Sequence, residues 1–128
     1  MNKRFTEFLK VLKALNDEGV EYGLVGGYAV ILHGASRNTE DIDVFVKSTE
    51  ENLALLRKAL DSIFNDVSIS ELTCDELQKY PVIRYVAPND FAMDIISQLG
   101  ERFTFEDINF TVIEVEGVSV RLASLETL

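Results

Sequence analysis

The 128-residue sequence has too few cysteine and histidine residues for a disulfide or a common zinc site. Cys74 is the only cysteine and His33 the only histidine. No disulfide can therefore form within the chain, and these two residues cannot supply the usual four zinc ligands. Proline and glycine are also sparse, and 47% of the residues are hydrophobic. This composition is typical of a folded domain and not of a disordered chain.

A long apolar run and an excess of basic residues are also missing. No segment approaches the roughly 20 apolar residues needed to span a bilayer, and the N-terminal stretch is amphipathic, unlike a signal peptide. We therefore expect a cytoplasmic protein with no membrane segment. The formal net charge of −10 argues against extended nucleic-acid binding by this domain alone. It still allows an anionic substrate that binds through divalent cations.

Hydrophobic periodicity and turn signals predict a single α/β domain over residues 1–128, built from both helices and strands. Ser48 with Glu51, and Thr73 with Glu76, have the spacing of capping boxes. Ser124 resembles another N-cap, so we expect the final helix to be truncated at Leu128. The predicted helices cover residues 4–17, 28–33, a segment after Ser48 that ends at Phe64, and 73–79; the predicted strands cover residues 20–25, 42–47, 82–86, 91–96, 110–115 and 118–122.

Two aspartates in a strand are the most informative feature of the sequence. Asp41 and Asp43 are separated by one apolar residue, so in a strand their side chains point to the same face. A pair of carboxylates in an apolar strand is costly unless a cation accompanies it. Carboxylate oxygens are ligands that Mg²⁺ prefers. The pair therefore predicts a magnesium site.

Two further features fit such a site. Gly26 and Gly27 lie where a predicted strand turns into a helix, and thirteen residues separate Gly27 from Asp41. Backbone N–H groups at such a turn can bind phosphate, although a simple tight turn would also explain the glycines. Asp94 is a single carboxylate within the apolar strand 91–96. It is a candidate third ligand, and the alternatives are an exposed residue or a structural ion pair.

The order Gly26-Gly27, Asp41-Ile42-Asp43 and Asp94 resembles the signature of the DNA polymerase β-type nucleotidyltransferase superfamily. The segment 24–44 is similar to small prokaryotic proteins related to abortive-infection nucleotidyltransferase toxins and to minimal nucleotidyltransferase antitoxins. This resemblance covers about residues 5–125 and implies a nucleotidyltransferase fold, with a mixed β-sheet flanked by α-helices. Many active members have Gly-Ser where this chain has Gly26-Gly27, and Ser36 is a candidate substitute for the missing hydroxyl.

The resemblance implies that Asp41, Asp43 and Asp94 hold two Mg²⁺ ions and that Gly26-Gly27 binds the phosphates of an NTP. A nucleoside monophosphate would then be transferred to a hydroxyl acceptor, which could be a protein side chain, a tRNA end or a small molecule. Arg37 is a candidate phosphate ligand or a solvated loop residue. Two alternatives stay open: an antitoxin-like protein that binds a toxin partner, and a degenerate nucleotide-binding module.

Three other residues have simpler explanations. We expect Lys79 and Arg84 to be solvated surface cations and not nucleotide ligands. Cys74 should be a small buried hydrophobe in a capped helix.

Overall fold

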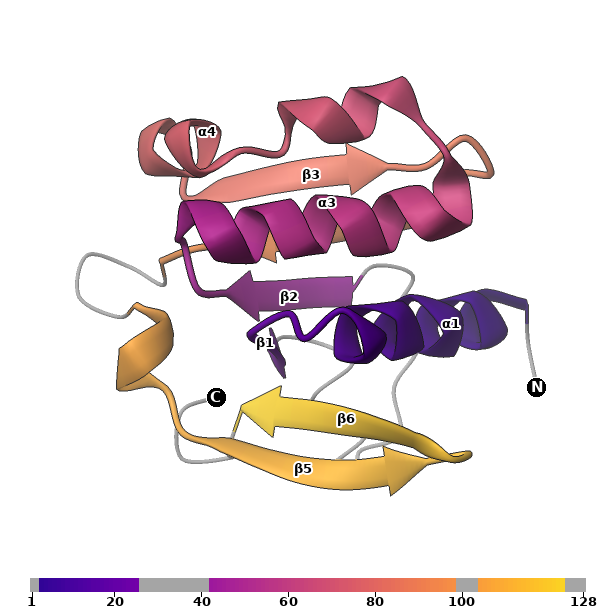
Figure 1. The fold of residues 1–128 in the computed structure, drawn as a ribbon. Helices are drawn as coiled ribbons and strands as arrows, with labels where there is room; N and C mark the ends of the chain where they lie inside the picture. Colours follow the sequence, from indigo (N-terminus) through magenta and orange to yellow (C-terminus); the bar gives the residue numbers. More distant parts are fainter. Residues whose placement is uncertain (1–2, 26–41, 99–103, 124–128) are drawn as a thin grey trace.

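The computed structural model describes residues 3–25, 42–98 and 104–123. These residues form a mixed six-stranded sheet with helices packed against it (Figure 1), which confirms the predicted fold class. The helical elements are α1 (Lys3–Asp17), α3 (Glu50–Phe64), η1 (Val67–Glu71), α4 (Cys74–Lys79) and η2 (Phe105–Asp107); the strands are β1 (Tyr22–Val25), β2 (Ile42–Val46), β3 (Val82–Val86), β4 (Ala92–Ile96), β5 (Phe110–Val115) and β6 (Val118–Ala123).

The strand order is β3-β4-β2-β1-β6-β5. Strand β2 pairs antiparallel with β1 and parallel with β4, and β1 pairs parallel with β6. The hairpins β3–β4 and β5–β6 confirm the strand pairs predicted around their turns. At the β5–β6 turn Glu116 and Gly117 both have positive φ, which a glycine adopts without strain. In the strand order, the β3–β4 hairpin forms one edge of the sheet and the β5–β6 hairpin forms the other.

The main core lies between the sheet and the helices α1 and α3, which run side by side in front of the strands (Figure 1). Alternate residues of β2 face this core, because successive side chains of a strand point to opposite faces. The predicted periodicity of both helices is confirmed, because most of the apolar side chains at the predicted spacing are buried in this core. The fully buried helix residues include Phe8, Leu12, Leu15, Leu53, Leu56 and Leu60.

The predicted first strand begins too early. Val20 lies in the turn that follows α1, where its N–H donates to the Leu15 carbonyl over 3.0 Å. Gly19 makes this ending possible with a φ of +74°, as is common after a helix C-terminus. The strand starts only at Tyr22.

The two predicted capping boxes have different outcomes. Thr73 is confirmed as an N-cap, since its Oγ1 accepts the Glu76 N–H over 3.2 Å. Ser48 is wrong as the cap of α3, because Thr49 takes this role and accepts the Asn52 N–H over 3.1 Å. The Ser48 hydroxyl instead lies 3.8 Å from Cys74 Sγ. Cys74 is only half-buried and its Sγ donates to the Ser48 carbonyl, so the expectation of a small buried hydrophobe is also wrong.

Asn52 ties the start of α3 to two strands. It is only 3% exposed and is the one buried polar residue of the described ranges. Its Oδ1 accepts the Glu21 N–H over 2.8 Å, and its Nδ2 donates to the carbonyls of Glu21 and Lys47 over 2.9 and 2.8 Å. A buried amide is costly without hydrogen-bond partners. Keeping these three bonds therefore holds the start of α3 at a fixed position relative to β1 and β2.

Asp66 caps η1 and connects it to the sheet. Its carboxylate accepts the hydroxyl and the N–H of Ser68 over 2.7 and 3.2 Å, and the hydroxyl of Tyr85 over 2.9 Å. These bonds, those from Ser68 foremost, lower the pKa of Asp66. Burial, followed by the bond to Asp66, raises the pKa of Tyr85. The hydrogen bonds that Asp66 accepts therefore favour the ionised form of its carboxylate.

We expect this network to make stability depend on pH in the acid range. The pKa of Asp66 is lower in the folded than in the unfolded state, so its contribution is complete above the unfolded value of about 4. The contribution is lost as pH falls through the folded value. Urea unfolding should therefore show Asp66→Asn less stable than wild type at pH 7, with the difference shrinking at pH 3. Glu114→Gln, at an exposed position of β5, is the control, and a difference independent of pH would contradict the assignment.

No helix among residues 3–25, 42–98 and 104–123 is both long and apolar enough to cross a membrane.

Candidate active site

Several predicted site residues fall outside the residues that the structure describes. These are Gly26, Gly27, Ser36, Arg37 and Asp41. The predicted helix over residues 28–33 and the N-cap at Ser124 lie outside them as well. The predicted site residues that the structure describes are Asp43 and Asp94, which lie on two central strands of the sheet.

Asp43 and Asp94 lie side by side. Strand β2 pairs with β4 in parallel, and Asp43 is the register partner of Asp94. Register partners on neighbouring strands point to the same face of a sheet. This is the face opposite the main core, because the flanking residues Ile42, Val44 and Met93 are buried against the helices. Both aspartates are partly exposed.

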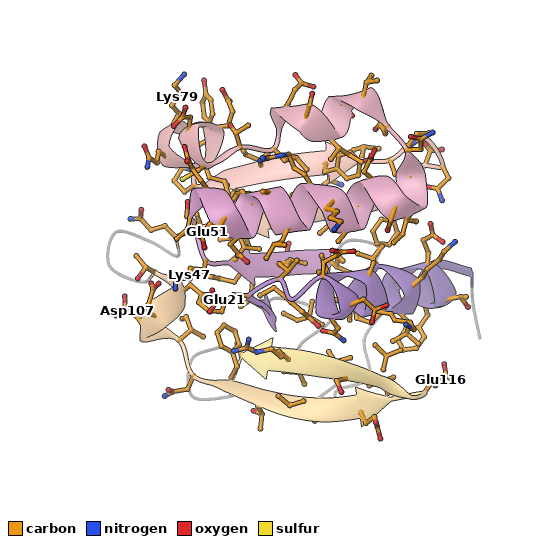
Figure 2. All side chains as sticks on the ribbon, in the orientation of Figure 1. Glu21, Lys47, Glu51, Lys79, Asp107 and Glu116 are labelled. Atoms are coloured by element: carbon orange, nitrogen blue, oxygen red, sulfur yellow. The ribbon has the colours of Figure 1, made fainter. Side chains whose placement is uncertain are left out.

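Arg84 extends the row of charged side chains to the edge of the sheet. It is the register partner of Asp94 in the antiparallel pair β3–β4. Its Nη1 lies 3.3 Å from Asp94 Oδ1, and the two side chains are 49% and 23% exposed. The expectation that Arg84 is merely a solvated cation is therefore wrong. By contrast Lys79, also expected to be solvated, is exposed and projects from α4 at the periphery of the molecule (Figure 2).

The sequence contained a signal for the Arg84–Asp94 pair. The turn Pro88-Asn89-Asp90 joins the two strands, and Asp90 donates its N–H to the Ala87 carbonyl over 2.9 Å. Arg84 and Asp94 lie at equal distances in sequence from Asn89, so a hairpin folded about that residue places them opposite each other.

A small apolar cluster adjoins the charged row on the same face. Phe45 follows Asp43 by two residues and Ile96 follows Asp94 by two, and both are buried with Val25, Ile108 and Ala123. Phe105 and Phe110 stack with ring centroids 5.1 Å apart. The guanidinium of Arg121 lies 5.7 and 5.3 Å from these two ring centroids. The carboxylates therefore lie at the border between an apolar cluster and the cation of Arg84.

Gly23 makes room for this cluster. A Cβ atom at position 23 would overlap the ring of Phe110, which lies directly over β1. The glycine is therefore required by close packing in a strand, where this residue is otherwise unfavourable.

The donors present fit a magnesium site in their chemistry. Two carboxylates on adjacent strands supply hard oxygen ligands, which Mg²⁺ prefers over nitrogen or sulfur. Within the described residues no group of three or more His, Cys, Asp or Glu side chains could hold a metal ion. Asp41, the remaining predicted ligand, lies outside that part of the chain.

Comparison with solved structures identifies the fold. The chain is similar to a candidate nucleotidyltransferase, TM1012, from Thermotoga maritima, whose crystal structure was determined at 1.87 Å resolution. The TM-score is 0.62 at 14% sequence identity, and the match covers 96% of this chain and 78% of the other. At this identity the likeness shows the fold alone, and that fold is of the nucleotidyltransferase type.

Comparison with family models identifies the family. The model described as "Nucleotidyl transferase AbiEii toxin, Type IV TA system" matches residues 10–128. The chain therefore belongs to this family of nucleotidyltransferases, which confirms the resemblance seen in the sequence. No curated protein matches the chain in sequence.

Proposed function

We propose that this protein transfers a nucleoside monophosphate from an NTP to a hydroxyl acceptor in a Mg²⁺-dependent reaction. The observation that carries the proposal is the in-register pair of Asp43 and Asp94 on one face of a nucleotidyltransferase-type sheet. Two adjacent carboxylates repel each other, and the ion pair from Arg84 to Asp94 offsets part of this repulsion. A bound cation that also contacts the anionic phosphates would offset more of it.

In this proposal Asp41, Asp43 and Asp94 would hold the two Mg²⁺ ions. When bound, these ions would neutralise negative charge on the phosphates and on the leaving group. Gly26 and Gly27 would bind the β- and γ-phosphates through backbone N–H groups, with Ser36 and Arg37 as further candidate phosphate ligands. The protein's part would be to hold donor and acceptor in line.

The proposed transfer balances as follows. The acceptor hydroxyl oxygen forms a bond to the α-phosphorus, and the bond from this phosphorus to the bridging oxygen of the β-phosphate breaks. Pyrophosphate leaves with the electrons of that bond. Asp94 would accept the hydroxyl proton as general base.

A transfer assay tests this proposal. Each of the four NTPs, labelled at the α-phosphate, would be incubated with Mg²⁺, the protein and candidate hydroxyl acceptors. We expect transfer of label and release of an equal amount of pyrophosphate, both lost in Asp94→Asn. Nucleotide binding with no transfer to any acceptor would favour the degenerate nucleotide-binding module, for which Gly27 in the place of a serine is the supporting observation.

The family's description also bears on partners. It names a toxin of a type IV toxin–antitoxin system, which favours an enzymatic toxin over the antitoxin-like alternative. On this basis we propose that an antitoxin encoded with this protein counteracts it.

A further inference from the structure

Arg84 is a charged residue that contacts the candidate site and that the proposed reaction does not use. It lies on β3, at the edge of the sheet, and its side chain is half exposed. The row of register partners runs from Arg84 through Asp94 to Asp43 across three adjacent strands. The guanidinium therefore approaches the carboxylate pair from the side of Asp94.

The charge of Arg84 has two opposite effects on a cation bound by the pair. Its hydrogen bond to Asp94 Oδ1, 3.3 Å long, fixes the orientation of a carboxylate that would otherwise rotate. Its positive charge repels any divalent ion held by the same carboxylate. Because Asp94 has further oxygen lone pairs, the arginine and a metal ion can share it. The repulsion then acts while both are bound.

We propose that Arg84 is a positioning residue that acts through Asp94 and lowers the affinity of the Asp43–Asp94 pair for a divalent cation. This inference rests on the proposed function, since it takes the pair as the metal site. A weakened affinity leaves the pair to bind the ion mainly as its complex with an NTP, whose phosphates contribute the missing negative charge. Arg84 thereby couples metal binding to nucleotide binding.

A titration with Mn²⁺ alone tests the inference. Electron paramagnetic resonance would measure the dissociation constant of Mn²⁺ for wild type, Arg84→Gln, Arg84→Lys and Lys79→Gln. Glutamine keeps an N–H donor for Asp94 but removes the charge, whereas lysine keeps the charge. Lys79→Gln makes the same change of charge at an exposed position on α4. Circular dichroism would establish that each variant is folded.

We expect Arg84→Gln to bind Mn²⁺ roughly fivefold more tightly than wild type, the size expected from removing one charge several Å from a divalent ion in a solvated site. The dissociation constants of Mn²⁺ for Arg84→Lys and Lys79→Gln should stay within about twofold of the wild-type value. The gain in Mn²⁺ affinity of Arg84→Gln should become smaller at high salt, because salt screens the repulsion. Unchanged or weaker binding by Arg84→Gln, with wild type still binding, would overturn the inference and leave the metal site standing. No binding by any variant would overturn the proposed metal site itself.

Discussion

Replacing Asp43 with Asn should reduce the proposed nucleotidyl transfer by at least about 100-fold. In the proposed site Asp43 would be a metal ligand, and the loss of a ligand costs more than the 10- to 100-fold typical of a ligand's hydrogen-bonding partners. Asparagine has nearly the same shape but no charge, so the strand pairing of β2 should persist. The rate of pyrophosphate release at saturating NTP and Mg²⁺ measures the effect.

The matched control for this prediction is Glu114→Gln, which makes the same change of charge at an exposed position of β5. It should retain the wild-type rate. Circular dichroism and a thermal melt would show whether both variants are folded. An Asp43→Asn variant that keeps more than about a tenth of the wild-type rate would remove Asp43 from the proposed site.

Replacing Asn52 with Ala should lower the free energy of unfolding by about 3 kcal/mol, since each buried group left without its partner costs about 1–3 kcal/mol. The variant loses three side-chain bonds, to the N–H and carbonyl of Glu21 and to the carbonyl of Lys47. Glu21 and Lys47 lie close together at the ends of their segments (Figure 2), with Lys47 Nζ 3.6 Å from Glu21 Oε2. Because Glu21 and Lys47 are partly exposed, we expect water to satisfy some of the freed backbone groups, so that the loss is smaller than the sum of three buried groups.

Urea unfolding of Asn52→Ala and Thr49→Ala would measure this effect. Thr49→Ala removes only the N-cap of the same helix and should cost about 1 kcal/mol. If the two variants lose equal stability, the side-chain bonds of Asn52 contribute nothing beyond the capping of α3, and its role as a tie between helix and strands is wrong.

Local patterns in the sequence predicted most of the described elements. The alternation in β2 and the helical spacing of Phe8, Leu12 and Leu15 identify the core faces because burial imposes the same period on any sequence. The ends of helices and strands are harder to predict from local patterns. Ser48 and Thr49 are adjacent and both suit an N-cap; the buried Asn52, placed three residues after Thr49, decides between them in the structure.

The candidate site was only partly predictable. The spacing of Asp41 and Asp43 predicts that they share a face, but nothing local indicates that Asp43 pairs with Asp94. That pairing joins strands separated by α3, η1, α4 and β3, and it depends on the tertiary fold. The interaction between Arg84 and Asp94 was accessible from the turn at Asn89. It was missed because an exposed arginine is usually solvated.

The most direct measurement of the central claim is calorimetric titration of NTPs into wild type and Asp43→Asn, with and without Mg²⁺. If Asp43 and Asp94 form the metal site, wild type should bind at least one NTP much more tightly with Mg²⁺, because the ion offsets the repulsion between carboxylates and phosphates. Asp43→Asn should lose most of this Mg²⁺ dependence. Equal NTP affinity with and without Mg²⁺ in both proteins would contradict the assignment of Asp43 and Asp94 to a metal-dependent nucleotide site.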